Sequence, residues 1–309
     1  MKPASLRSTP FAKAAFTLIT LGSFAFSQNS AVKTPAPALS FSVTVSGAGQ
    51  SMILIPGLES SSEVWSGVID HYKSKYQLHA ITLAGFAGQP AIPGLRLSNV
   101  KDDVIRYIRD NKLAHPVLVG HSLGGFLALW IAASIPDQID HVIAVDGVPY
   151  LPALFNPAAT AAEAKRDGEQ IRTLYASLKP DQLEGMTRMS LTQMITDPKY
   201  IEIAAKWAAH SDGAFVGEAV YDLMTTDLRQ EMVKIRAPVL LVGAGKALAS
   251  NPERLEVARA AYEKQMQSVP NHNVVLAANA LHFIMFDDPA FLMRTMDEFL
   301  AQKEAANAR

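Results

Sequence analysis

Short apolar runs separated by turn residues predict the strands of a sheet. Residues 41–45 alternate between apolar and polar side chains, as a half-buried strand does. The later runs are apolar almost throughout, which is typical of central strands buried on both faces. We expect strands over residues 41–45, 51–55, 78–83, 116–119, 142–145, 239–242 and 273–276.

Helical periodicity occupies the intervals between most of these strands. Val64, Trp65, Val68 and Ile69 recur at helical spacing and predict a helix over residues 62–72. Further helices are expected over residues 100–108, 126–133 and 289–300. Strands that alternate with helices in this way form a doubly wound, mostly parallel sheet, so the predicted fold class is α/β.

The alternation is interrupted between residues 151 and 235, where only helical patterns occur, including those of 161–178 and 198–209. A helical insertion on the carboxyl side of a parallel sheet is expected to form a lid over the strand ends. Its methionine and aromatic side chains could offer apolar groups an adaptable surface. We therefore divide the chain into a first core part, 40–150, the lid, 151–235, and a second core part, 236–309.

The N-terminal segment carries the features of an export signal. Lys2, Arg7 and Lys13 precede an apolar stretch, 14–26, that is too short to span a membrane comfortably. Small residues at its end predict a cleaved signal peptide over 1–27, followed by a flexible linker over 28–39. We expect the protein to be periplasmic or secreted, with no stable membrane span after cleavage.

Charge and composition exclude several classes of function. The chain has 28 basic and 29 acidic side chains, so it has no basic field for nucleic acid or anionic lipid. It contains no cysteine, which excludes disulfides, a thiol nucleophile and thiolate metal sites. Residues 243–246 do not complete a phosphate-binding loop. We expect a small-molecule substrate and no cofactor or metal, and the oligomeric state stays open.

A G-x-S-x-G motif at Gly120, Ser122 and Gly124 lies between the strand 116–119 and the helix 126–133. A strand that turns sharply into a helix forces its corner residue into a strained backbone conformation and leaves no room for neighbouring side chains. Ser122 is thus the candidate nucleophile at the carboxyl edge of the sheet. The Leu123 amide, in the first helical turn, would face negative charge that develops beside it.

A serine hydroxyl needs a neighbouring base and an acid that fixes the tautomer of that base. Among eight histidines, His282 is the best candidate, because it follows the last strand at the same edge as Ser122. We expect His121 to point away from the neighbours of the serine. The candidate acid is Asp146, which directly follows the strand 142–145.

Other acids stay open as alternatives. Asp146 could merely cap the turn at Gly147. In that case the acid would be Asp287, Asp288 or a residue of the lid such as Asp227.

The order Ser122, Asp146, His282 resembles the α/β-hydrolase family, in its serine-nucleophile, esterase- or lipase-like branch. Residues 56–65 are similar to the family's oxyanion loop, with Pro56 in place of the usual histidine. The resemblance implies that Leu58 provides a second oxyanion donor through its backbone amide. It also implies an acid after the strand 239–242, where no carboxylate occurs, or, as in a minority of members, at the position of Asp146.

These features predict a serine hydrolase that cleaves a carboxylic ester of a small, apolar substrate through an acyl-enzyme. Two alternatives stay open. The same triad could hydrolyse an amide, a lactone or a carbon–carbon bond. The fold could also be a catalytically silent scaffold that binds a ligand.

Overall fold

The computed structural model describes residues 38–156, 158–248 and 251–307. The predicted signal peptide, 1–27, and residues 28–37 of the predicted linker lie outside the described residues. All described residues belong to the unit that begins at Ala38.

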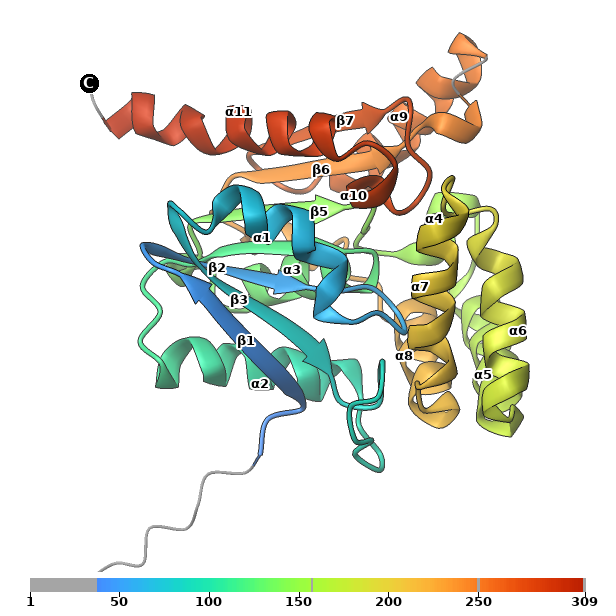
Figure 1. Cartoon of the computed structure of the whole chain (residues 1–309). Coiled ribbons are helices and arrows are strands. Elements are labelled where there is room, and N and C mark those ends of the chain that lie inside the picture. The colour runs from blue at the N-terminus through green and yellow to red at the C-terminus, as the bar shows by residue number, and fades with distance from the viewer. Residues whose placement is uncertain (1–37, 157, 249–250, 308–309) are drawn as a thin grey trace, which may run out of the picture. The chain divides into compact units, whose positions relative to one another are not determined.

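Seven strands of the described chain form one sheet in the order β1-β3-β2-β4-β5-β6-β7 (Figure 1). All neighbouring strands pair in parallel except β1, which is antiparallel to β3 at one edge. This confirms the doubly wound, mostly parallel sheet. The strands are β1 (Phe41–Gly47), β2 (Gln50–Ile55), β3 (Tyr76–Leu83), β4 (Val117–His121), β5 (His141–Val145), β6 (Val239–Ala244) and β7 (His272–Ala277).

Helices cover both faces of the sheet, so alternate residues of its strands enter two different cores. Ile53 and Ile55 of β2 pack with residues of α2, α3 and α9, whereas Met52 and Leu54 pack with residues of α1 and α11. This explains the continuous apolar runs of the central strands. The covering helices are α1 (Ser66–Tyr72), α2 (Leu97–Asp110), α3 (Leu123–Ser134), α9 (Pro252–Met266), α10 (Ile284–Asp287) and α11 (Pro289–Asn307).

Five α-helices of the described chain lie between β5 and β6, and we call them the helical insertion. They are α4 (Leu151–Phe155), α5 (Ala161–Ser177), α6 (Pro180–Leu191), α7 (Pro198–Ala209) and α8 (Gly213–Thr225). Figure 1 shows α5 to α8 beyond the arrowheads of the parallel strands.

Backbone hydrogen bonds join the helical insertion to loops that follow strands. Gly88, after β3, donates to the His210 carbonyl at 2.8 Å, and Phe283, after β7, donates to the Met194 carbonyl at 3.1 Å. The helical insertion therefore contacts loops at the carboxyl edge of the sheet.

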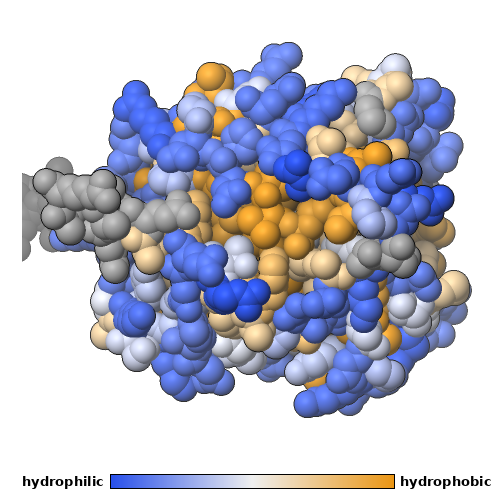
Figure 2. All heavy atoms as spheres, turned by 90° about the horizontal axis from the view of Figure 1, so that it is seen from above, coloured by the Kyte–Doolittle hydropathy of each residue, from blue (hydrophilic) through white to orange (hydrophobic). Residues whose placement is uncertain are grey.

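Single-turn 3-10 helices complete the described chain: η1 (Ser62–Trp65), η2 (Pro136–Gln138), η3 (Glu231–Lys234) and η4 (Lys246–Leu248). Seen from above, apolar residues gather in the middle of the molecular surface and hydrophilic residues surround them (Figure 2). No helix within the described ranges combines the length and the hydropathy that crossing a bilayer requires.

Candidate active site

Ser122 stands at the corner between β4 and α3, in a backbone conformation with φ 52° and ψ −117°. The surrounding glycines are required by close backbone approaches. A methyl group on Gly120 would lie 2.0 Å from the Gly124 carbonyl oxygen, and one on Gly124 would lie 2.1 Å from the Ile55 carbonyl oxygen. Such contacts leave no space for any other residue, so the motif is a steric requirement of this turn.

Asp146 and His282 come together at the same edge, although 136 residues separate them in the chain. Nδ1 of His282 lies 2.5 Å from Oδ2 of Asp146. The other carboxylate oxygen, Oδ1, accepts a hydrogen bond from the Tyr262 hydroxyl at 2.6 Å and another from the Ala244 amide at 3.0 Å. Three donors therefore surround this carboxylate and hold it in one orientation.

These contacts determine the charge of Asp146. Burial alone would raise its pKa, but the hydrogen bonds from His282, Tyr262 and Ala244 outweigh burial and hold the pKa of Asp146 below its usual value. Burial and the neighbouring Asp146 charge raise the pKa of Tyr262 well above its usual value. The pair is thus an ionised carboxylate and a neutral phenol that donates to it and helps to hold it in place.

Neighbouring strands connect Ser122 to Asp146. The Ser122 amide donates to the Val145 carbonyl at 2.9 Å, and the Asp146 amide donates to the Val242 carbonyl at 2.8 Å. Between the described residues, Ser122 Oγ and the His282 imidazole make no direct hydrogen bond. Such contacts are often long in free enzymes and tighten when substrate binds.

His121 does not point away from these residues, and that expectation is wrong. Nε2 of His121 lies 3.1 Å from the His282 carbonyl oxygen, and the two rings have centroids 4.6 Å apart. Burial, reinforced by the neighbouring His282, lowers the pKa of His121 to about 3, so its imidazole is neutral. A neutral ring with its proton on Nε2 donates to the loop that carries His282 and supports its position.

Leu58 and Leu123, the predicted oxyanion donors, follow residues of the serine turn and of the loop beside it. Leu123 is the first residue of α3 and directly follows Ser122, and Leu58 follows Gly57, where an added methyl group would lie 3.4 Å from Ser122 Cβ. Neither amide donates a hydrogen bond to another described residue. Both N–H groups are therefore available to an oxygen bound beside Ser122.

The alternative acids have other partners. Asp287 accepts from the Leu281 amide at 2.9 Å, and the Thr196 hydroxyl donates to it at 2.7 Å. Asp288 accepts from the Phe291 amide at 3.1 Å.

Asp227, the alternative acid from the predicted lid, is paired with Arg229 at 2.6 Å. None of the three carboxylates hydrogen-bonds His282 within the described chain.

The sequence analysis did not identify Tyr262 as part of the site. Tyr262 lies on α9, and no motif relates it to Asp146, which is 116 positions earlier.

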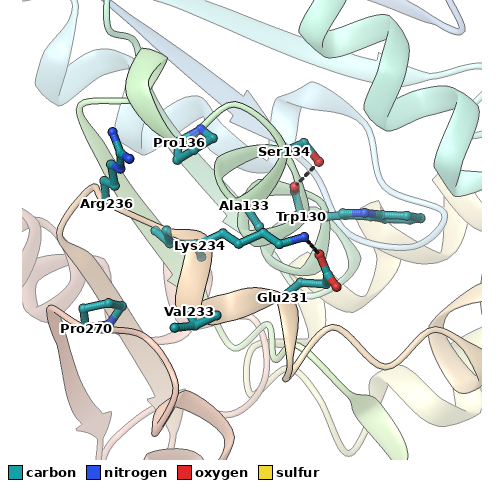
Figure 3. Close-up of a pocket in the computed structure, with 10 residues that line it drawn as sticks. Trp130, Ala133, Ser134, Pro136, Glu231, Val233, Lys234, Arg236 and Pro270 are labelled. Atoms are coloured by element: carbon teal, nitrogen blue, oxygen red, sulfur yellow. Dashed lines mark hydrogen bonds and ion pairs between the residues drawn. The ribbon is translucent and has the colours of Figure 1, made fainter.

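Two cavities in the described part of the chain lie away from Ser122 and His282. One, of about 700 Å³, is lined by residues of α3, η2 and η3 together with Pro270, which precedes β7, so it opens near the amino ends of the strands (Figure 3). Lys234 and Glu231, both on η3, form an ion pair within its lining (Figure 3). The other, of about 610 Å³, is lined by residues 91–95, α5 and α8. We do not assign the reaction to either cavity, since neither contains a nucleophile with a base.

No cluster of metal-ligating side chains occurs in the ranges that the structure describes.

A model of the Alpha/beta hydrolase family matches residues 45–295, and the chain therefore belongs to this family. Its relatives are named as esterases and other hydrolases, which identifies the chain as an enzyme.

Three relatives illustrate the similarity. A 2-(acetamidomethylene)succinate hydrolase of Mesorhizobium japonicum is 24% identical over 272 residues, 85% of this chain and 92% of its own length. A pimeloyl-[acyl-carrier protein] methyl ester esterase of Nitrosomonas europaea is 23% identical over 210 residues, 66% of this chain and 79% of its own. The solved structure of a thermophilic esterase from Thermogutta terrifontis, 18% identical, superposes with a TM-score of 0.66 over 85% of this chain and 93% of its own.

Proposed function

We propose that the chain hydrolyses a carboxylic ester of a small, apolar substrate through Ser122, His282 and Asp146. The observation that carries this proposal is the 2.5 Å contact between His282 Nδ1 and an ionised Asp146, at the sheet edge where Ser122 occupies its strained turn. A carboxylate at Nδ1 leaves Nε2 as the free base of the ring. Nε2 is the atom that can take a proton from the serine.

The reaction proceeds in two halves. Ser122 Oγ attacks the ester carbonyl carbon while its proton passes to His282 Nε2. The tetrahedral intermediate then expels the alcohol, which takes the proton from Nε2, and leaves an acyl group on Ser122. Water attacks this acyl group, gives a proton to Nε2, and the carboxylic acid departs as the serine regains its proton.

The negative charge of each intermediate develops on the former carbonyl oxygen. The amides of Leu58 and Leu123 are the donors we assign to it. Leu123 directly follows Ser122, Leu58 follows Gly57, which packs beside the serine, and neither amide donates a hydrogen bond in the described chain. Removal of one such donor typically costs about 10²- to 10³-fold in kcat. The helical insertion acts in this proposal as a lid over the site.

A second candidate reaction is amide hydrolysis. The relative that matches 85% of this chain is named for an acetamidomethylene compound, whereas another is named for a methyl ester. A panel of esters, amides and lactones of equal acyl length separates these reactions by their relative kcat/KM.

Export of the protein remains a further proposal, and N-terminal sequencing of the protein recovered outside the cytoplasm would test it.

Substitution of Ser122 by alanine is the direct test of the proposed function. We expect Ser122→Ala to lose turnover of p-nitrophenyl acetate and covalent labelling by a fluorophosphonate probe. Ser134→Ala is the matched control, because Ser134 is the exposed last residue of α3, the helix that follows Ser122, and within the described chain its hydroxyl donates only to the Trp130 carbonyl. Full turnover or labelling of Ser122→Ala would refute the mechanism, and an unlabelled parent protein would indicate a silent scaffold.

A further inference from the structure

Glu59 occupies an unusual position in the loop that follows β2. The Ser60 amide donates to the Gly57 carbonyl at 3.2 Å and closes a turn in which Glu59 has a φ of 57°. This left-handed conformation favours glycine or asparagine at the third position of a turn, and other residues adopt it at a cost. Glu59 is also only 5% exposed. Its side chain must therefore make interactions that stabilise the turn.

The carboxyl group of Glu59 reaches the helical insertion. The Thr187 hydroxyl, on α6, donates to Oε2 of Glu59 at 2.9 Å, across 128 residues of sequence. The other oxygen, Oε1, is buried and has no hydrogen-bond partner in the described chain. Burial and the Glu59 charge raise the pKa of Tyr175, on α5, to about 12. The Thr187 hydrogen bond thus joins the loop after β2 to α6 of the helical insertion.

We propose that Glu59 is a positioning residue that couples the seating of the helical insertion to the oxyanion hole through its contact with Thr187. This inference rests on the proposed function, in which Leu58, the preceding residue, supplies an oxyanion donor. The Leu58 N–H shares one planar peptide unit with the Gly57 carbonyl, which accepts from the Ser60 amide. A side chain that keeps this turn closed therefore also fixes the direction of the Leu58 N–H. When Thr187 is withdrawn, the strained turn loses a partner and the Leu58 amide loses its direction.

The carboxyl group suits this role in its neutral form. Burial, only partly offset by the Thr187 hydrogen bond, raises the pKa of Glu59 to about 7. A neutral carboxyl group places no negative charge beside the site where the intermediate itself becomes negative. Arg188, next to Thr187 in the sequence of α6, pairs with Glu184 and with Glu202 of α7.

The test measures steady-state hydrolysis of p-nitrophenyl acetate by Glu59→Ala, Glu59→Gln, Thr187→Val and the Glu59→Ala/Thr187→Val double variant. We expect Glu59→Ala and Thr187→Val to lose about tenfold in kcat with KM changed less than about twofold. Glu59→Gln keeps an acceptor for the Thr187 hydroxyl, so its kcat should be close to that of the parent protein. The double variant should be no slower than the slower single variant, because the two substitutions remove the same hydrogen bond.

Two further readouts separate positioning from a general structural role. Glu59→Gln cannot ionise, so its kcat should stay level above pH 7, where that of the parent protein declines. Ser190→Ala is the matched control on α6, because Ser190 is exposed and, among the described residues, its hydroxyl donates only to the Met186 carbonyl. We expect this control to keep parental kcat and pH profile.

The inference is refuted if folded Thr187→Val keeps parental kcat, or if Glu59→Gln is as slow as Glu59→Ala. Thr187→Val decides the matter even where Glu59→Ala fails to fold, since it removes the hydroxyl at constant shape. These outcomes differ from failure of the proposed function, in which the parent protein itself neither turns over the ester nor reacts with the fluorophosphonate through Ser122.

Discussion

Replacing Asp146 by asparagine should select the wrong tautomer of His282. The two carboxylate oxygens have different partners, since Oδ1 accepts from Tyr262 at 2.6 Å and from Ala244 at 3.0 Å, whereas Oδ2 lies 2.5 Å from His282 Nδ1. A backbone amide can only donate, so the introduced side-chain oxygen will stay toward Ala244. The introduced NH₂ group then faces Nδ1, and the ring must carry its proton on Nε2.

An imidazole with its proton on Nε2 cannot accept the proton of Ser122. We expect kcat to fall by about 10³- to 10⁴-fold, or ~4 to 5.5 kcal/mol of transition-state stabilisation. The assay is p-nitrophenyl acetate hydrolysis, with circular dichroism to show that the variant is folded. Asp227→Asn is the control, because Asp227 pairs with Arg229 and makes no hydrogen bond to His282 in the described chain. A folded Asp146→Asn with kcat within tenfold of the parent would contradict the assignment.

Three other outcomes follow from single contacts. Tyr262→Phe removes one donor to the triad carboxylate and should lower kcat about three- to tenfold at unchanged KM in steady-state assays. Gly124→Ala places a methyl group 2.1 Å from the Ile55 carbonyl oxygen and should abolish soluble, active protein, whereas Gly185→Ala, with open space around it, should not. Burial raises the pKa of Glu59 from 4.5 to about 7, so its contribution to stability is complete below pH 4.5 and is lost as the pH rises through 7. Urea unfolding at pH 8.5 should therefore find Glu59→Gln more stable than the parent by up to ~3 kcal/mol, with no such gain at pH 4.5.

Local chemistry explains why so much of the fold could be predicted. The central strands are buried on both faces, so their apolar runs are long enough to recognise, and β6 begins and ends within two residues of its predicted bounds. Ser122 could be identified because its turn excludes side chains at Gly120 and Gly124, which is a constraint within five consecutive residues. Asp146 and His282 could be nominated because each follows a strand of a parallel sheet, and such strands end at one edge.

The remainder depends on contacts between segments that no local pattern relates. The strand β1 runs antiparallel to β3. A parallel and an antiparallel edge strand show the same alternation of side chains, so the sequence of β1 does not indicate its direction. His121 lies inside the motif, yet its position against the His282 loop depends on where the chain returns 161 residues later. The same holds for Tyr262 and for Glu59, whose partners come from α9 and from the helical insertion.

Glu59 illustrates why some functional residues could not be predicted from the sequence. A glutamate after a buried strand carries no signal in the sequence, since the same letter is ordinary on an exposed turn. It becomes informative only when the structure gives it a left-handed backbone, 5% exposure and a hydroxyl donor from α6. Each of these has a cost that an exposed serine or glycine would avoid. These three features occur together at the residue that follows Leu58. The contact between the loop after β2 and the helical insertion is therefore where we expect the activity of this enzyme to be adjusted.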